Sequence, residues 1–245
     1  MSAPQAASAF REAIPDLSLV VPAFNEEADL DESIRRANGT LESLGVPYEI
    51  LVVNDGSKDR TGSIADQLAA DLPKVRVFHQ KNQGIGGAFR TGVENSLGRY
   101  IALWPVDMPC TPEGLSPFTS AIGKASVIVG CRRARVGYNP LMRLNAGIYP
   151  YLVRALFGLR LRDVNWICLY DRELLRRIPL TQSGIPMLAE ILVRMRDAGA
   201  TFHEIDVEMV QRTTGVPSAA RFKVMRRTLT GLFDLHRTWR REKRA

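Results

Sequence analysis

The sequence predicts an α/β fold in which a mostly parallel sheet is flanked by helices and followed by an amphipathic, basic C-terminal helix. Three observations support this prediction. Short apolar runs alternate with segments of helical periodicity, which is typical of a parallel sheet covered on both faces. Apolar residues make up 45% of the 245 residues, so a core can form without disulfides. The net charge of +7 belongs to the C-terminal segment.

Strands are predicted over four short runs rich in branched apolar residues, at positions 17–22, 48–54, 75–79 and 100–103. Helices are predicted between them, at positions 26–44, 61–70 and 86–96. Because a helix separates each strand from the next, we expect parallel pairing through right-handed crossovers.

The C-terminal segment, residues 221–245, contains nine Lys or Arg and two acidic residues, so the rest of the chain is formally neutral. A basic groove across the fold is therefore not expected, and no nucleic-acid partner is predicted. Apolar residues recur at helical spacing at Phe222, Met225, Leu229 and Leu232. Such a helix suits an anionic membrane surface, and it equally suits packing on the domain with a solvated basic end.

The N-terminal residues lack the basic start and apolar centre of a signal peptide, and no apolar run approaches the roughly 20 residues that span a bilayer. The three cysteines form no CxxC pair, so neither a disulfide framework nor a structural zinc site is expected. We therefore expect a cytoplasmic protein.

Polar and acidic residues follow three of the predicted strands, at positions 22–27, 54–57 and 104–107. Because ligands bind beyond the carboxyl ends of parallel strands, we expect these segments to line one site for a ligand rich in hydroxyls and phosphates. No GxGxxG follows the first strand, and neither a P-loop nor GxSxG occurs. Their absence disfavours hydride transfer, P-loop ATP hydrolysis and serine hydrolysis.

Three motifs indicate a known family: VVPAFNEE at 20–27, VVNDGSKDRT at 52–61 and KNQGIGGAFRTG at 81–92. In this order and spacing the chain resembles family 2 glycosyltransferases of the GT-A fold, in the dolichyl-phosphate mannose synthase and polyprenyl-phosphate glycosyltransferase branch. The resemblance extends over roughly residues 17–215 and includes Gly130–Arg132, Leu161–Asn165 and Arg212–Gly215.

This resemblance implies a Rossmann-like GT-A domain over residues 17–220, between an N-terminal extension (1–16) and the basic helix (221–245). It also implies that a sugar passes, with inversion, from a nucleotide-sugar to a polyprenyl- or dolichyl-phosphate acceptor at the membrane surface. The protein would then be peripheral on the cytoplasmic face of the membrane.

For the donor, the resemblance assigns nucleotide-sugar binding to Pro22, Ala23, Glu26, Asp55, Gly84 and Gly86. Asp55 would accept hydrogen bonds from the base or ribose, or else form an Asx turn before the next helix. Glu26 would line the nucleotide or cap its own helix. The glycines, with Gly87, would let the backbone approach the diphosphate at a helix N-terminus, although such clusters also occur in plain turns.

Mg²⁺ or Mn²⁺ is also implied, with Asp107 as the metal ligand and a catalytic residue. The family has two aspartates around one residue at this point, whereas the triplet here is Pro105-Val106-Asp107. One carboxylate, diphosphate oxygens and waters can hold Mg²⁺, which would neutralise the leaving diphosphate. The departure leaves metal dependence open, and with it a degenerate transferase that binds nucleotide-sugars or regulates. Asp107 is otherwise a turn residue before Pro109.

For the acceptor, the resemblance assigns phosphate binding to Arg132 and Arg143, and Arg212 would face the diphosphate or the acceptor; the planar guanidinium gives bidentate bonds to phosphate. Asp163 is implied as a catalytic base or orienting residue, although the family's following Ser-Gly-Phe-Arg is replaced at 166–169. A lipid phosphate is already an anionic nucleophile, so positioning matters more than a strong base.

Further alternatives stay open. The acceptor could be a soluble molecule. The segment 144–161 is either an interfacial helix that receives the lipid or part of the core. The sequence specifies neither the donor base and sugar, nor the acceptor, nor the oligomeric state.

Overall fold

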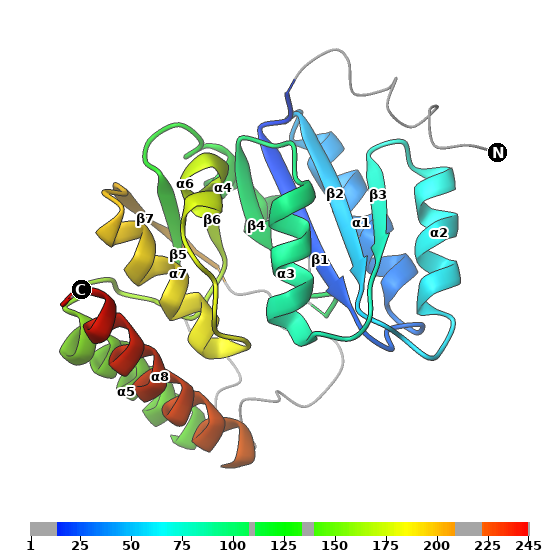
Figure 1. The fold of residues 1–245 in the computed structure, drawn as a ribbon. Helices are drawn as coiled ribbons and strands as arrows, with labels where there is room; N and C mark the ends of the chain where they lie inside the picture. The colour runs from blue at the N-terminus through cyan, green and yellow to red at the C-terminus, as the bar shows by residue number, and fades with distance from the viewer. Residues whose placement is uncertain (1–13, 108–110, 134–139, 209–221, 245) are drawn as a thin grey trace.

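A seven-stranded sheet, with strand order β3-β2-β1-β4-β6-β5-β7, forms the centre of the molecule (Figure 1). The computed structural model describes residues 14–107, 111–133, 140–208 and 222–244. The strands are β1 (Leu17–Ala23), β2 (Tyr48–Asn54), β3 (Val75–His79), β4 (Tyr100–Leu103), β5 (Val127–Arg132), β6 (Cys168–Asp171) and β7 (Phe202–Val207). All neighbouring strands pair in parallel except β6, which is antiparallel to both β4 and β5.

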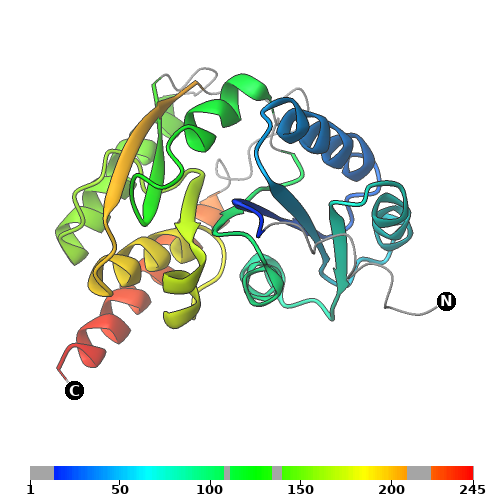
Figure 2. The ribbon, with the colours of Figure 1, turned by 90° about the horizontal axis from the view of Figure 1, so that it is seen from above.

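Helices cover both faces of the sheet, as Figure 2 shows from above. They are α1 (Leu30–Ser43), α2 (Thr61–Asp71), α3 (Gly84–Asn95), α4 (Pro112–Thr119), α5 (Pro140–Phe157), α6 (Arg172–Arg177), α7 (Ile185–Asp197) and α8 (Phe222–Glu242). One core cluster contains apolar residues of α1, α2 and α4, and the other contains those of α3, α5, α7 and α8. The buried strands lie between them, which confirms the predicted mostly parallel sheet with helices on both faces.

The first four strands and three helices lie close to their predicted positions. Helix α1 begins at Leu30 rather than at residue 26, so the prediction was wrong by one turn. The preceding residues form a loop that is held from outside the helix: the Glu26 N–H donates to Thr61 Oγ1 (2.7 Å), and the Glu27 N–H donates to Asp59 Oδ2 (3.3 Å). Tertiary hydrogen bonds therefore replace the helical turn here.

Helices α5 and α8 lie side by side at one end of the sheet, at the lower left of Figure 1. Phe157 of α5 makes edge contacts with His236 and Trp239 of α8, at ring-centroid distances of 5.5 and 5.4 Å. In the segment 144–161, predicted as an interfacial helix or as core, Val153 is fully buried and part of the core, whereas Tyr151 is 70% exposed. The interfacial role stays a prediction. Among the described residues, no helix combines the length and the hydrophobicity needed to cross a bilayer.

Candidate functional site

The ends of β1, β2 and β4 bring the predicted donor loops to one edge of the sheet. Strand β1 lies between the other two, with Ala23 opposite Asn54 of β2 and Val20 opposite Leu103 of β4. All three strands are parallel, so the loops that follow them emerge at the same carboxyl edge. This edge is where parallel sheets bind ligands.

Asp55, directly after β2, is 3% exposed and is oriented by the loop after β3. Its Oδ1 accepts hydrogen bonds from the Gln80 amide (2.6 Å) and the Gln83 N–H (2.9 Å). Helix α2 takes its first-turn hydrogen bond from another residue, since Asp59 Oδ1 accepts from the Thr61 N–H (3.0 Å). In the described residues Asp55 therefore does not cap α2, and its carboxylate is held at the carboxyl edge.

Glu26 and Asp107 bring negative charge to the middle of this edge. Burial raises the pKa of Glu26 above its ordinary value, and the charges of Asp107, Asp29 and Asp59 raise it further. Asp107 itself is exposed, in the loop after β4. Asp29 occupies the N-cap position of α1, where no side chain makes a capping hydrogen bond, so Glu26 does not cap this helix. The raised pKa of Glu26 therefore comes first from burial and, beyond that, from a local excess of carboxylates.

This excess fits a hydrated divalent cation. Carboxylate oxygen is a ligand that Mg²⁺ and Mn²⁺ prefer, and positive charge at this point would relieve the repulsion that acts on Glu26. No group of three or more Asp, Glu, His or Cys arranged to hold a metal occurs among the described residues. The protein would therefore supply few ligands, with Asp107 first, and substrate oxygens and water would supply the rest.

Pro22 and Ala23 are the last two residues of β1 and lie at the carboxyl edge. Ala23 is 1% exposed, and its carbonyl accepts from the Asp55 N–H (2.9 Å), whereas Pro22 is partly exposed. Through this bond, the ends of β1 and β2 hold each other in place.

The predicted diphosphate-binding glycines lie at the N-terminus of α3. Gly84 has a positive φ of 72°, which glycine adopts without strain. The Gly86 N–H donates to Ser183 Oγ (3.3 Å), and a Cβ at Gly86 would lie 2.9 Å from the Gln182 carbonyl oxygen. Residues 181–184, which we call the strap, therefore cross the start of α3 so closely that only glycine fits there.

The strap is fixed from the other side by a buried carboxylate. Glu190 of α7 is fully buried and accepts hydrogen bonds from the Thr181 and Gln182 N–H groups at 2.9 and 2.7 Å. Arg194 donates to Glu190 (3.0 Å) and to Glu242 of α8 (2.7 Å). The C-terminal helix and the start of α3 are thus connected through one chain of polar contacts.

Arg132 and Asp163, both predicted site residues, form a buried ion pair. Arg132 Nε donates to Asp163 Oδ2 (2.8 Å), and Nη2 donates to Oδ1 (3.0 Å), with side chains 6% and 3% exposed. The Trp166 ring lies 4.6 Å from the guanidinium carbon. Arg132 ends β5, which runs parallel to β7, and Asp163 precedes the antiparallel β6, so both lie at the carboxyl edge. Asp163 orients Arg132 in this arrangement.

Two predicted residues cannot be placed. Arg212 lies outside the described residues, and Arg143 lies in α5 in the part whose side chains are not described. Their roles stay predictions.

Sequence reasoning missed four residues that hold the predicted ones. Gln80 and Gln83 orient Asp55, Ser183 contacts Gly86, and Trp166 covers Arg132. Gln83 adjoins the glycine cluster and could have been noticed. Ser183 is 97 residues from its partner, and no local pattern signals the contact.

Comparison with known proteins finds a match between residues 18–179 and the family model described as "Glycosyl transferase family 2". Undecaprenyl-phosphate 4-deoxy-4-formamido-L-arabinose transferase of Pectobacterium atrosepticum is 25% identical over 218 residues, which cover 86% of this chain and 65% of that protein. Undecaprenyl-phosphate mannosyltransferase of Micrococcus luteus is 29% identical, covering 80% and 84%. Dolichol-phosphate mannosyltransferase of Pyrococcus furiosus is 26% identical, covering 73% and 52%. The chain thus spans less than two thirds of the first and third of these relatives.

Solved structures share the fold. Glucosyl-3-phosphoglycerate synthase from Mycobacterium tuberculosis, in complex with Mn²⁺, UDP-glucose and phosphoglyceric acid, superposes with a TM-score of 0.66 at 18% identity. The match covers 91% of this chain and 80% of that one. The same enzyme with Mg²⁺ and UDP gives 0.66 at 17% identity, covering 90% and 79%. The expected GT-A fold and the resemblance to family 2 are both confirmed.

Proposed function

The chain belongs to glycosyl transferase family 2, and on this premise we propose that it is an inverting glycosyltransferase. It moves a sugar from a nucleotide-sugar donor to a polyprenyl-phosphate acceptor at the cytoplasmic face of the membrane. The observation that supports this most is the shared carboxyl edge, where Asp55, Glu26 and Asp107 lie on neighbouring parallel strand ends. The polyprenyl-phosphate transferases among its relatives support the choice of acceptor.

The donor lies across the carboxyl ends of β2, β1 and β4. Asp55, fixed by Gln80 and Gln83, accepts hydrogen bonds from the base or ribose. Pro22, Ala23 and Glu26 form the wall beside it. The N-terminus of α3, at Gly84 and Gly86, faces the diphosphate, because the helix dipole there favours negative charge. The N–H groups of these two glycines donate to Asn82 Oδ1 and Ser183 Oγ, and a bound diphosphate would compete for them.

Asp107 is the residue that would hold Mg²⁺ or Mn²⁺, together with diphosphate oxygens and water. When bound there, the ion would supply positive charge beside the leaving diphosphate. Glu26 lies close enough to Asp107 that the Asp107 charge raises the pKa of Glu26. When ionised, Glu26 adds negative charge beside the proposed metal ligand.

The acceptor phosphate oxygen attacks the sugar C1 from the side opposite the diphosphate. The new C1–O bond forms as the bond to the diphosphate breaks, so the anomeric centre inverts. The attacking oxygen is already ionised, so no base has to remove a proton. We assign Asp163 the orienting role, because its carboxylate holds the Nε–Nη2 edge of the Arg132 guanidinium through two hydrogen bonds. Arg132, Arg143 and Arg212 are the proposed phosphate ligands.

Helices α5 and α8 provide the contact with the membrane. Exposed Ile148 and Tyr151 on α5 and Phe233 on α8 present apolar surface beside the arginines of α8. A helix with this composition lies in the interface and is attracted to anionic lipids.

A transfer assay tests the proposal. The protein is incubated with a panel of nucleotide-sugars and polyprenyl phosphate in detergent, with Mg²⁺ or Mn²⁺. We expect a glycosylated lipid from at least one donor, and loss of turnover on chelation. Asp107→Asn lowers turnover about a hundredfold or more, because the metal supplies several kcal/mol to the transition state. The melting temperature changes little, since the Asp107 side chain is exposed.

Asp29→Asn is the matched control, because it removes another exposed carboxylate that acts on Glu26 and has no proposed ligand role. Equal turnover of Asp107→Asn and the unaltered protein contradicts the metal role. Nucleotide binding in calorimetry without transfer or donor hydrolysis favours a degenerate binding protein. Transfer only to a soluble acceptor overturns the lipid assignment.

A further inference from the structure

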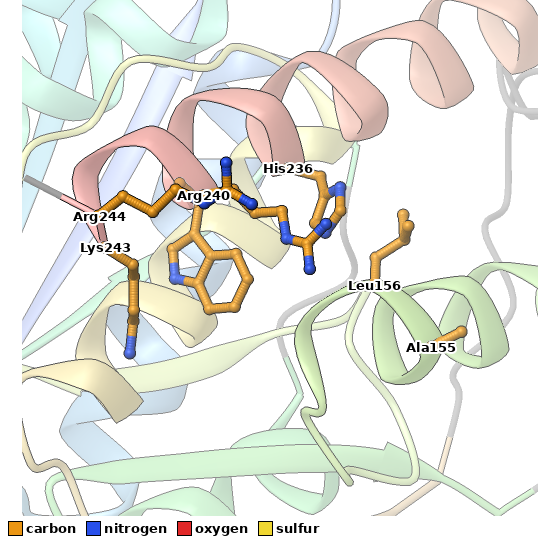
Figure 3. Close-up of a pocket in the computed structure, with 7 residues that line it drawn as sticks. Ala155, Leu156, His236, Arg240, Lys243 and Arg244 are labelled. Atoms are coloured by element: carbon orange, nitrogen blue, oxygen red, sulfur yellow. The ribbon is translucent and has the colours of Figure 1, made fainter.

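A basic pocket of about 460 Å³ lies between the C-terminal ends of α5 and α8 (Figure 3). Its cationic lining comes from Arg240, Lys243 and Arg244, beside His236. Helix α5 starts near the carboxyl edge, and its 18 residues place its far end about 25 Å along the helix axis. The pocket is therefore separate from the donor site and from Arg132.

The positive charge in this pocket is largely uncompensated. None of the described residues that line it is acidic. Asp197 contacts Lys243 at 3.4 Å from outside the lining, whereas Arg240 and Arg244 have no ion pair within the described part of the chain. Arg240 and Arg244 are one helical turn apart, so their side chains lie on the same face of α8. Two exposed guanidinium groups on one face are well suited to a phosphate, which accepts their paired N–H donors.

The aromatic side of the pocket is held in place. Trp239 Nε1 donates to Asp197 Oδ2 (2.6 Å), and the Trp239 ring makes an edge contact with Phe157. The His236 ring stacks on Trp239 at a centroid distance of 6.0 Å. The aromatic wall of the pocket is therefore fixed before a ligand binds, and the exposed side chains of Arg240 and Arg244 are the part that a ligand would order.

The surroundings of the pocket are apolar, and this decides between two sources of phosphate. Ala155 and Leu156 line it, and Ala155 lies on the same face of α5 as the exposed Ile148 and Tyr151. Phe233, 46% exposed, precedes the pocket on α8. Free phosphate gains nothing from binding beside an apolar surface. A lipid does gain, because its headgroup phosphate binds cationic side chains while its acyl chains contact apolar ones.

We propose that this pocket binds the headgroup phosphate of an anionic membrane lipid, with Arg240 and Arg244 as its ligands. The proposal rests on the membrane association in the proposed function and assigns it a specific site. It places a second lipid contact at the far end of the α5–α8 pair, apart from the acceptor phosphate. Both helices then lie along the membrane and not across it.

Vesicle flotation tests the pocket with a matched pair of variants. The Arg240→Gln/Arg244→Gln variant removes both proposed ligands. The Arg237→Gln/Arg241→Gln variant removes two charges with the same spacing from the same end of α8, but neither residue lines the pocket. With phosphatidylcholine vesicles containing phosphatidylglycerol, we expect both variants to lose the general attraction of two positive charges to an anionic surface. The first variant should partition about tenfold more weakly than the second, because only the first also loses the paired N–H donors to the headgroup phosphate.

Equal losses in the two variants overturn the proposal, because they indicate attraction by net charge alone. Thermal unfolding and circular dichroism check that both variants fold, as expected for exposed residues. Titration with inorganic phosphate separates the two sources. Saturable phosphate binding that is lost in Arg240→Gln/Arg244→Gln, with unchanged flotation, assigns the site to free phosphate and overturns the lipid proposal.

The transfer assay in detergent distinguishes failure here from failure of the proposed function. Arg240→Gln/Arg244→Gln should turn over the polyprenyl-phosphate acceptor in detergent as the unaltered protein does, and more slowly when the acceptor is in anionic vesicles. Full activity on vesicles together with normal flotation refutes the lipid pocket and leaves the transferase assignment intact.

Discussion

Glu26 is the residue whose protonation depends most directly on the charges at the carboxyl edge of the sheet. Burial and three neighbouring carboxylates raise its pKa above the ordinary 4.5. The folded state therefore holds this proton more tightly than the unfolded chain does. Its contribution to stability is fully present below pH 4.5 and is lost as the pH rises through the raised pKa. At neutral pH the ionised side chain opposes folding.

We expect Glu26→Gln to raise the melting temperature relative to the unaltered protein at pH 7 more than at pH 4. The neutral amide avoids the cost of burying an ionised carboxylate and, beyond that, the repulsion from Asp107, Asp29 and Asp59. Thermal unfolding across this pH range measures the difference. Added Mg²⁺ should reduce the difference in melting temperature between the variant and the unaltered protein at pH 7, because the ion offsets the negative charge around Glu26. A difference that does not vary with pH would contradict this account of the edge.

At the scale of single elements, α3 depends on close approach to the strap. The first turn of this helix touches residues 182 and 183, and the strap is fixed in turn by Glu190 and Arg194. Directly after the strap, Pro186 in the first turn of α7 lies against Gly231 of α8, where a Cβ would be 2.8 Å from Pro186 Cγ. The strap and the start of α7 thus pack against α3 and α8, and each of these two helices has a glycine at the contact.

Gly86→Ala should destabilise the protein by about 1–3 kcal/mol, because its Cβ meets backbone that has to move. It should also weaken nucleotide-sugar binding, since the shifted strap disturbs the start of α3. Urea unfolding and calorimetry measure the two effects. Gly39→Ala is the control: it lies inside α1 with nothing within 4 Å of the new Cβ, and should be neutral or stabilise by about 0.5–1 kcal/mol. Equal changes in the free energy of unfolding for the two substitutions would show that the contact between Gly86 and the strap does not contribute to stability.

At the scale of the whole molecule, α8 is part of the core and also the most basic element. Leu232 and Leu235 are fully buried in the same cluster as α7 and β5 residues. Glu242 pairs with Arg194 near the end of the helix. Deleting α8 would therefore expose core surface as well as remove charge, and point variants separate the two roles.

Leu232→Ala should cost about 2–5 kcal/mol of folding free energy, as expected for a fully buried leucine. Phe233→Ala, next to it but 46% exposed, should change stability by no more than about 0.5 kcal/mol. Denaturant unfolding of the two variants measures the contrast. A small effect at Leu232 would mean that α8 is only loosely attached.

Local patterns along the chain were sufficient to predict β1 to β4 and α1 to α3, because apolar periodicity depends on neighbours a few residues away. The start of α1 was placed a turn too early, since Thr61 and Asp59 hold the preceding loop. Strands β5 to β7 were not predicted. The reversal at β6 depends on how the strand pairs and not on its own four residues.

The sequence by itself determined which acidic residues meet at the carboxyl edge of the sheet. Asp55, Glu26 and Asp107 follow parallel strands, and the carboxyl ends of such strands meet at one edge. Only the tertiary structure decided which side chains hold them, that Asp163 orients Arg132, and that Ser183 meets Gly86. The physical reason is that these contacts join residues far apart in the chain, whose separation in space is set by packing and leaves no periodic signal in the sequence.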